Sequence, residues 1–266
     1  MKLENIKTAV ILCGGRGTRL GLIGKKIPKS LIKIHGYPII WFIINILIKN
    51  SFNHFILPTG YKGKLLSKYF KKNLLYKNIK FDLVNTGIDT SIAKRIYLIK
   101  NKIKSENFLL LNGDAILDCN IKKIYEEHVQ RKDNMTFIGC EAQLNFGTVG
   151  ISNGKIINFE REIKFNAVNV KNKSNFSGKV YSGMSIMRKN ILNINFKKSI
   201  NFEKDLYPRI IKKLKCNFAS LKGFWHSIDN VKDINSLNKN INLKKYKSVI
   251  NIIKKIKKYE KKFLEK

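Results

Sequence analysis

The feature that most constrains the fold is an apolar run that stops at two glycines. The run covers residues 8–13, and Gly14-Gly15-Arg16-Gly17-Thr18-Arg19-Leu20 follows it directly. A continuous apolar run of this length is typical of a parallel strand buried on both faces. Glycines directly after such a strand let the main chain approach a ligand closely and turn N–H groups toward phosphate oxygens. The pattern predicts an α/β protein with an anion-binding loop after its first strand.

Strand-like and helix-like segments then alternate along the chain. Further strands are expected at 54–57, 81–84, 108–111 and 135–140, and helices at 38–49, 63–72, 91–100 and 121–131. This alternation predicts a Rossmann-like, doubly wound, mostly parallel sheet with right-handed crossovers. After residue 146 the strand-like runs at 148–151, 155–159 and 180–187 are shorter and separated by Gly and Asn turns. We expect these three runs to form a small antiparallel, sugar-binding extension over the ligand. A helix at 203–215 and a strand at 217–221 complete the pattern.

The C-terminal segment is predicted to be a basic amphipathic helix. Its apolar residues recur at roughly helical spacing on a lysine-rich background: Tyr246, Val249, Ile253, Ile256 and Phe263. Such a helix can lie on a membrane, but packing against its own domain or a partner subunit is more common. We therefore divide the chain into a domain of residues 1–240 and a helix of residues 241–266, and we expect no membrane association. The sequence leaves open whether the protein is a homo-oligomer.

The net charge of the chain is strongly positive, because 53 Lys and Arg face 18 Asp and Glu, giving +35. Such an excess is typical of nucleic-acid-binding proteins. Here it is nearly all lysine, it is spread through every segment, and Ile and Asn are abundant beside it, as an AT-rich genome favours. We interpret the charge as compositional and expect no nucleic-acid partner. The positive field would still help to collect anionic substrates.

The cysteines and the N-terminus indicate a cytoplasmic protein. Cys13, Cys119, Cys140 and Cys216 lie far apart and form no C-x-x-C pair, so neither a zinc site nor a disulfide framework is predicted. We expect reduced, buried thiols. The first residues do not resemble a signal peptide, and the apolar run at 39–48 is too short to cross a bilayer.

Two cations complement the glycine loop. Arg19 closes the loop motif, and Lys29 follows Pro28 shortly afterwards. Arg19 offers a planar fork of donors and Lys29 a movable point charge, so together they could neutralise a triphosphate from two sides. The loop has no Gly-Lys-Ser/Thr ending, which excludes a P-loop, and Leu20 occupies the last glycine position of the dinucleotide-binding motif.

The motif G-G-x-G-T-R-L with a downstream Pro-Lys resembles the signature of the sugar-1-phosphate nucleotidyltransferase family, and the resemblance continues in order to about residue 240. It implies transfer of a nucleoside monophosphate from an NTP to a sugar 1-phosphate, with release of pyrophosphate. It further implies that Arg19 assists the departure of pyrophosphate, that Lys29 contacts phosphate, and that the nucleotide is bound by Leu12, Gly14, Gly15, Gly17 and Thr18.

Two aspartates are the candidate metal ligands. Asp114 follows the 108–111 strand and Asn112-Gly113, at the end of a strand where open α/β sheets bind ligands. A carboxylate beside a triphosphate requires a cation between them, and Mg²⁺ is the natural one. Asp114 could instead be a turn or cap residue, and Asp229 a helix cap. The resemblance implies that Asp114 and Asp229 form an Mg²⁺-binding pair, with Asp114 in the catalytic group. His226 is expected to be structural or to line the ligand.

Several segments resemble the glucose-1-phosphate cytidylyltransferase branch, namely Gly60-Tyr61-Lys62-Gly63, residues 84–90, and Gly223-Phe224-Trp225-His226 with Asp229 and Asp233. This favours CTP, with Thr86 and Arg95 at the nucleotide. The chain departs from the branch in two places. Ala93 and Lys94 replace two glycines before Arg95, and the Glu-Lys-Pro that holds the sugar phosphate is not cleanly present. Its lysine would be replaced by Arg161 or Lys164, and the sugar would be lined by Gly183 and Glu203.

Three alternatives remain. One is a guanylyl- or thymidylyltransferase of heptose, mannose or glucose 1-phosphate. Another is a non-catalytic relative that binds nucleotide sugars and regulates a partner. The third is a basic nucleic-acid-binding protein, which only the net charge supports. An enzyme is favoured over a silent relative because Arg19, Lys29, Asp114 and Asp229 are all present.

Overall fold

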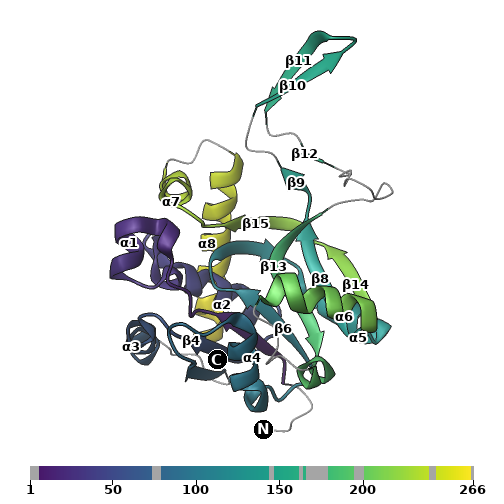
Figure 1. The fold of residues 1–266 in the computed structure, drawn as a ribbon. Helices are drawn as coiled ribbons and strands as arrows, with labels where there is room; N and C mark the ends of the chain where they lie inside the picture. The colour runs from purple at the N-terminus through teal and green to yellow at the C-terminus, as the bar shows by residue number, and fades with distance from the viewer. Residues whose placement is uncertain are drawn as a thin grey trace.

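A central sheet with helices on both faces organises the protein (Figure 1). The computed structural model describes residues 6–73, 79–143, 147–161, 164–165, 179–194, 201–239 and 244–264. The strand order is β14-β8-β13-β6-β1-β4-β5, and β13 alone runs antiparallel to its neighbours. The predicted doubly wound, mostly parallel sheet is therefore confirmed. Its strands are β1 (Thr8–Leu12), β4 (His54–Thr59), β5 (Lys80–Asn85), β6 (Asn107–Asn112), β8 (Met135–Cys140), β13 (Val180–Arg188) and β14 (Cys216–Ser220).

The antiparallel extension is smaller than predicted, because β13 does not belong to it. β13 lies inside the main sheet between β6 and β8, with Ser185 opposite both Leu110 and Phe137. Its middle residues are buried on both faces, since Met184 and Met187 contribute to different hydrophobic clusters. Assigning this strand to a ligand cover was wrong, because a strand buried on both faces must lie within the sheet. The extension consists of the hairpin β10 (Gly147–Ser152) and β11 (Lys155–Arg161), which projects from the body in Figure 1, and the short pair β9 (Ala142–Gln143) and β12 (Lys164–Phe165).

Two hydrophobic clusters fix the helices to opposite faces of the sheet. Successive residues of a strand point to opposite faces, so Ala9 and Ile11 of β1 enter one cluster and Val10 enters the other. The larger cluster includes residues of α2 (Ile39–Lys49), α3 (Gly63–Asn73), α5 (Ile121–Arg131) and α8 (Lys244–Leu264). The smaller one includes residues of α4 (Ile92–Ile99) and α6 (Tyr207–Lys213).

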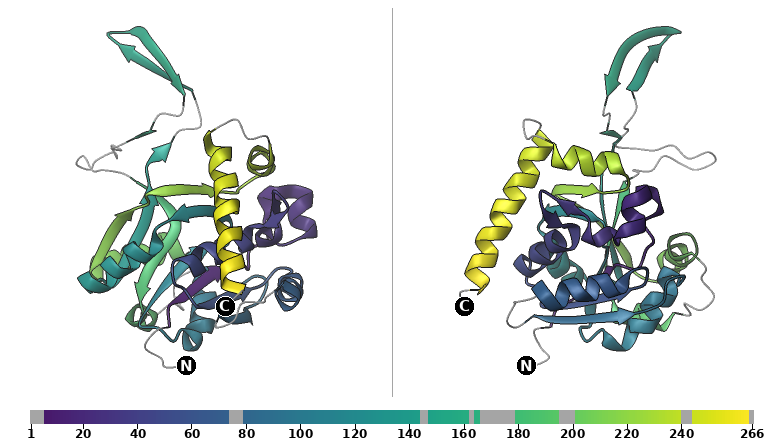
Figure 2. Two further views of the ribbon diagram at one scale, coloured as in Figure 1. Left: turned by 180° about the vertical axis from the view of Figure 1, so that it is seen from behind. Right: turned by 90° about the vertical axis from the view of Figure 1, so that its left-hand side faces the viewer.

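The C-terminal helix α8 packs on its own domain. It lies along the outside of the body in both views of Figure 2 and contacts α2. Val249, Ile252 and Ile256 are almost fully buried there. The apolar face of this helix is thus used in the protein's own core. Among the described helices, none is both long enough and apolar enough to cross a membrane.

A two-stranded ribbon at the end of the sheet was not predicted. Strand β15 (Gly223–Ser227) pairs antiparallel with β7 (Ala115–Cys119), and neither strand was expected from the sequence. β7 begins directly after Asp114, and β15 ends shortly before Asp229. The register places Ser227 opposite Ala115, and the main-chain N–H of Ile228 donates to the Asp114 carbonyl at 2.9 Å. The ribbon therefore brings the two aspartates to the same end. The remaining elements are α1 (Gly21–Lys26), β2 (Lys33–Ile34), β3 (Tyr37–Pro38) and α7 (Val231–Asn238).

Candidate active site

The candidate site lies where the strand order reverses. The chain passes from β1 outward to β4 and β5, then returns to the other side of β1 as β6. In an open α/β sheet, ligands bind at the carboxyl ends of the strands at such a switch point. The loop after β1 and the turn after β6 meet here, because the Gly113 N–H donates to the Leu12 carbonyl at 3.1 Å. They enclose a cavity of about 70 Å³ lined by Leu12, Cys13, Gly15, Gly17, Lys29, Ser30, Gly113 and Asp114.

The glycine loop has one position that requires glycine for its backbone. Gly17 has a φ of 63°, in the left-handed region, and its carbonyl accepts the Leu20 N–H at 3.0 Å. This turn starts the short helical segment Thr18–Leu20. It leaves the Arg19 side chain 80% exposed, with Nη1 at 3.8 Å from Asp229 Oδ1. The guanidinium of Arg19 thus lies near Asp229 and remains accessible to a ligand.

Three charged side chains from distant segments converge beside the cavity. Lys29 Nζ lies 2.8 Å from Asp114 Oδ2 and 3.3 Å from Asp229 Oδ1. The lysine side chain is only 18% exposed, so its ammonium is fixed mainly by the two carboxylates. All three residues were predicted from the sequence as candidate site residues, and the structure brings them together.

Asp229 is held in place by its neighbours and is not the helix cap that was the alternative interpretation. The cap of α7 is Asn230, whose side chain accepts the Asp233 N–H. Asp233 in turn accepts the main-chain N–H groups of Asp229 and Asn230. Ser227, which was not predicted from the sequence, donates to Asp229 Oδ2 at 3.0 Å. One carboxylate oxygen of Asp229 is therefore fixed by a hydroxyl, and the other faces Lys29.

The donor set of this cluster fits a hard divalent cation. Asp114 and Asp229 share one ammonium, so both carboxylates point at a common space. Across the described ranges, no cluster of three or more His, Cys, Asp or Glu side chains suits a metal ion. Mg²⁺ is commonly held by one or two carboxylates together with substrate phosphates, so the pair fits that ion when a triphosphate supplies the other ligands.

Thr86 and Arg95, which were predicted to bind the nucleotide, lie beneath the loop. Arg95 is 5% exposed, and its guanidinium donates to the main-chain carbonyls of Gly14 and Ile88. Burial lowers the pKa of Arg95 from its ordinary value. Thr86 is also buried, and its hydroxyl donates to the Thr59 carbonyl at 2.8 Å. The structure therefore places these side chains where they support main-chain atoms of the loops.

The predicted sugar-side residues are only partly assembled. Gly183 has a φ of 74°, and a Cβ there would lie 2.5 Å from the Asn112 amide nitrogen. It thus packs closely on the strand that leads to Asp114. Glu203 is exposed and lies in the turn Phe202–Leu206. Arg161 ends β11 and Lys164 begins β12, while their side chains lie outside the described part of the protein.

Comparison with known proteins decides the family. A family model described as "Nucleotidyl transferase" matches residues 8–242, a span that includes the glycine loop and both aspartates. The chain belongs to the nucleotidyl transferase family. The resemblance to sugar-1-phosphate nucleotidyltransferases found in the motifs is confirmed, and these matches support the activity of such an enzyme.

Curated relatives of this nucleotidyltransferase differ in the nucleotide that their names specify. A probable glucose-1-phosphate cytidylyltransferase from Bacillus subtilis (strain 168) is 30% identical over 251 residues, covering 87% of this chain and 94% of the relative. A D-glycero-alpha-D-manno-heptose 1-phosphate guanylyltransferase from Campylobacter jejuni is 31% identical over 230 residues, covering 83% and 93%. The crystal structure of HddC from Yersinia pseudotuberculosis has a TM-score of 0.66 at 22% identity, covering 87% of this chain and 97% of that one, and supports the fold.

Proposed function

We propose that this nucleotidyltransferase uses Mg²⁺ to transfer CMP from CTP to a sugar 1-phosphate, giving a CDP-sugar and pyrophosphate. The observation that carries the proposal is the convergence of Lys29 on Asp114 and Asp229 beside the glycine loop. CTP is favoured by the cytidylyltransferase-like segments and by the name of the B. subtilis relative. We also propose a cytoplasmic location, because all four cysteines are free thiols.

The reaction is an in-line displacement at the α-phosphorus. An oxygen of the sugar phosphate forms the new P–O bond, the bond between the α-phosphorus and the bridging oxygen breaks, and the electron pair leaves with pyrophosphate. Both reactants are anions, so the protein must align them and neutralise their charge. The main chain of the glycine loop would bind the phosphates, and the exposed Arg19 would stabilise the departing pyrophosphate.

We propose that Lys29 exchanges its carboxylate partners for a phosphate oxygen when the substrates bind. Its ammonium now balances part of the charge of Asp114 and Asp229. Held by the two carboxylates, Mg²⁺ would supply charge neutralisation at the phosphate oxygens. With the carboxylates neutralised in this way, the Lys29 ammonium would be free to turn toward a phosphate. On the sugar side we propose Gly183, Glu203 and either Arg161 or Lys164.

The test is pyrophosphate release with Mg²⁺ and each of CTP, dTTP, GTP and UTP, against a panel of sugar 1-phosphates. We expect release with CTP and one sugar phosphate, and loss of release in Asp114→Ala. Release with GTP and a heptose phosphate instead would favour the second candidate, which rests on the 31% identical C. jejuni relative. Silence with every pair, in a folded protein that binds nucleotide, would favour a non-catalytic relative.

A further inference from the structure

One buried guanidinium joins two loops and the end of a strand at the carboxyl edge of the sheet. Arg95 comes from α4, and its donors reach the segments that follow β1 and β5 and the last residue of β4. Nη2 donates to Gly14 O at 3.2 Å and to Ile88 O at 3.0 Å. Nη1 donates to Thr59 O at 3.1 Å and to Thr86 Oγ1 at 2.5 Å. Three of the four oxygens belong to loops around the candidate nucleotide site, and the fourth, Thr59 O, is at the end of β4.

This arrangement depends on the shape of arginine and not only on its charge. Within the described segments, no carboxylate lies within ion-pair distance of Arg95, so neutral oxygens satisfy its buried donors. Burying a charge without a counter-ion is costly unless its hydrogen bonds are made. The planar fork can donate to four oxygens in fixed directions, whereas a lysine ammonium offers three donors from one point. Lysine at this position would leave at least one of the four oxygens without its donor.

Gly14 and Gly60 pack so closely against the Arg95 guanidinium that neither leaves room for a side chain. A Cβ at Gly14 would overlap the Arg95 guanidinium, and one at Gly60 would lie 2.7 Å from Nη1. Neither residue has a positive φ, so close approach, and not backbone conformation, requires glycine here. The glycine loop and the segment after β4 therefore rest directly on Arg95.

A second, exposed contact joins the glycine loop to residues 86–89 at the rim of the site. Arg16 of the glycine loop donates to Asp89 Oδ1 through Nη2 at 2.6 Å and through Nε at 3.1 Å. Both side chains are exposed, so this pair is screened by solvent and contributes little. The buried Arg95 is the stronger of the two connections between the glycine loop and residues 86–89.

The direction of the nucleotide follows from the site geometry. The phosphates are expected on the β6 side of β1, at the cluster of Lys29, Asp114 and Asp229. The sugar is proposed to lie further from β1 on that side, where Gly183 packs on Asn112. The nucleoside must therefore extend the other way, toward the loops after β4 and β5. There we expect the base to bind between the glycine loop and residues 86–89, the two segments that Arg95 connects, and we call this expected base position the slot.

We propose that Arg95 is a positioning residue that sets the width of this slot and thereby determines which nucleotide base is accepted. This inference rests on the proposed binding of an NTP at the glycine loop. Arg95 does not touch the base but holds main-chain atoms that do. Its loss should therefore weaken NTP binding and base discrimination more than it slows the chemical step.

The experiment compares Arg95→Lys with Arg131→Lys in the full-length chain. Arg131 lies at the opposite edge of the sheet and also makes a short contact, with Nε 2.9 Å from Asp133 Oδ2. We measure kcat and KM for the preferred NTP, the ratio of kcat/KM between that NTP and the next best, and the melting temperature. For Arg95→Lys we expect KM to rise about 10- to 100-fold, discrimination to fall about tenfold, and kcat to stay within about threefold. Arg131→Lys should lower only the melting temperature.

A second variant covers the case in which Arg95→Lys does not fold. Gly14→Ala needs no unusual backbone angle, and its new methyl group would press on the guanidinium from the loop side. It should reproduce the rise in KM and the loss of discrimination. Because both changes act on one contact, the double variant should show less than the product of the two single effects.

The outcomes separate the proposal from the proposed function. If Arg95→Lys or Gly14→Ala melts at lower temperature but keeps wild-type KM and discrimination, Arg95 is only structural. If kcat falls while KM is unchanged, Arg95 acts in the chemistry and the proposal is wrong. If the wild type releases no pyrophosphate, the proposed function fails, and equilibrium dialysis of CTP and GTP then tests the slot alone. Equal affinities in wild type and Arg95→Lys would overturn the proposal.

Discussion

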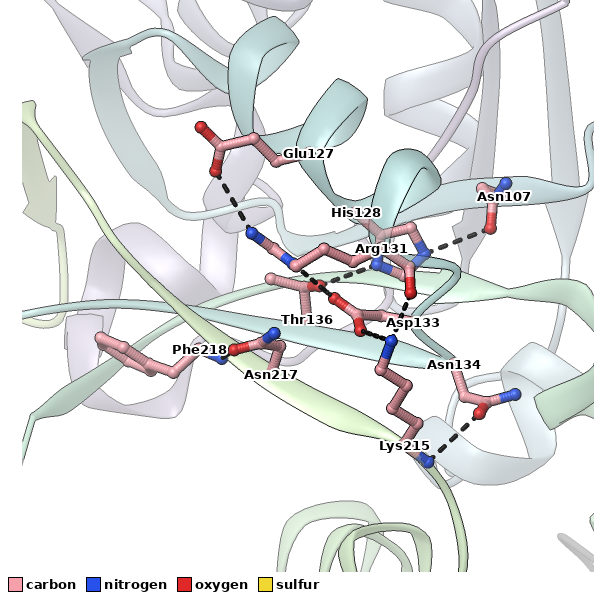
Figure 3. A network of polar contacts seen from close by, with 10 residues as sticks. All are labelled: Asn107, Glu127, His128, Arg131, Asp133, Asn134, Thr136, Lys215, Asn217 and Phe218. Carbon is pink, nitrogen blue, oxygen red and sulfur yellow. Dashed lines mark hydrogen bonds and ion pairs between the residues drawn. The ribbon is translucent and has the colours of Figure 1, made fainter.

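Two polar clusters at opposite edges of the same sheet use the same kinds of side chain in different ways. At the amino ends of β6, β8 and β14, Figure 3 shows a closed network around Asp133. Its carboxylate is fully buried between Arg131 Nε at 2.9 Å and Lys215 Nζ at 3.4 Å. The buried ring of His128 lies beside it, with Nδ1 at 2.8 Å from Thr136 Oγ1 and Nε2 at 3.1 Å from Asn107 Oδ1.

At the carboxyl ends, the cluster of Lys29, Asp114 and Asp229 is open. Its carboxylates are partly exposed, and Arg19 beside them is almost fully so. The difference teaches that charge alone does not mark an active site. A closed network has its charges matched by fixed protein groups, so it stabilises the fold. An open cluster retains unused charge and lone pairs that phosphate groups and a cation can satisfy.

The largest expected effect separates activity from stability at the open cluster. Asp114→Asn should reduce the rate of pyrophosphate release about 10²- to 10³-fold, because a neutral amide cannot hold the cation at the phosphates. Its melting temperature should stay near that of the wild type. Asp118→Asn is the matched control: it lies on the same ribbon but faces Lys255 Nζ at 2.8 Å. Equal losses in both variants would contradict the assignment of Asp114.

The second prediction concerns pH and the closed network. Desolvation by burial lowers the pKa of His128 to about 4, despite the opposing effect of Asp133. The unfolded chain, with a histidine pKa near 6.5, then binds more protons than the folded protein between about pH 6.5 and pH 4. The contribution of neutral His128 is present above that window and decreases as pH falls through it, by up to about 3 kcal/mol. Denaturant unfolding from pH 7 to pH 4 should show a smaller decrease in His128→Gln than in wild type, and equal slopes would contradict it.

The third prediction concerns Asp133, where we expect a loss of stability without a loss of activity. Asp133→Asn should lower the free energy of unfolding by about 2–3 kcal/mol, because it removes the charge-assisted hydrogen bond from Arg131 and the ion pair with Lys215. The KM and kcat of the folded enzyme should not change. Glu127→Gln is its control, since Glu127 meets Arg131 at 3.5 Å on the surface and should matter by less than about 0.5 kcal/mol. If Asp133→Asn slowed the enzyme without changing its stability, the conclusion that the Asp133 network only stabilises the fold would be wrong.

The smallest effect is expected for the exposed pair at the rim of the glycine loop. Arg16 and Asp89 are 51% and 77% exposed, so their ion pair should contribute about 0.2–1 kcal/mol. A double-mutant cycle of Arg16→Ala and Asp89→Ala, measured by denaturant unfolding, should give a coupling energy in that range that decreases with added salt. A coupling above about 2 kcal/mol would show that this contact is as strong as a buried one.

The elements that the sequence predicted best are those with strong local patterns. α5 (Ile121–Arg131) and β8 (Met135–Cys140) have the predicted bounds, and β1 differs from its prediction by one residue. β7 was missed because its short apolar run has no turn signal of its own, and its partner β15 lies about a hundred residues further along the chain. β13 was misplaced because neighbouring Gly and Asn turns resemble those of the hairpin, while its real partners are β6 and β8.

The candidate site also has residues that the sequence predicted and contacts that only the structure shows. Lys29, Asp114 and Asp229 could be named beforehand because their motifs resemble those of a family with a known site. Ser227 could not be found that way, because it belongs to none of those motifs. Arg95 was named at the nucleotide, but its hydrogen bonds to the loop carbonyls could not be predicted. Only the folded loops show that Arg95 lies under Gly14 and Ile88.

By itself the sequence determined the alternation of strands and helices, the glycine loop at the end of β1, and the charged residues available near it. These follow from interactions between residues close in the chain, where apolar spacing and backbone preferences decide the outcome. Only the tertiary structure decided that β13 enters the sheet, that β7 and β15 carry Asp114 and Asp229 to one place, and which charges are buried. The physical reason is that strand pairing and burial depend on surfaces brought together from distant segments. Such surfaces exist only after the chain has folded.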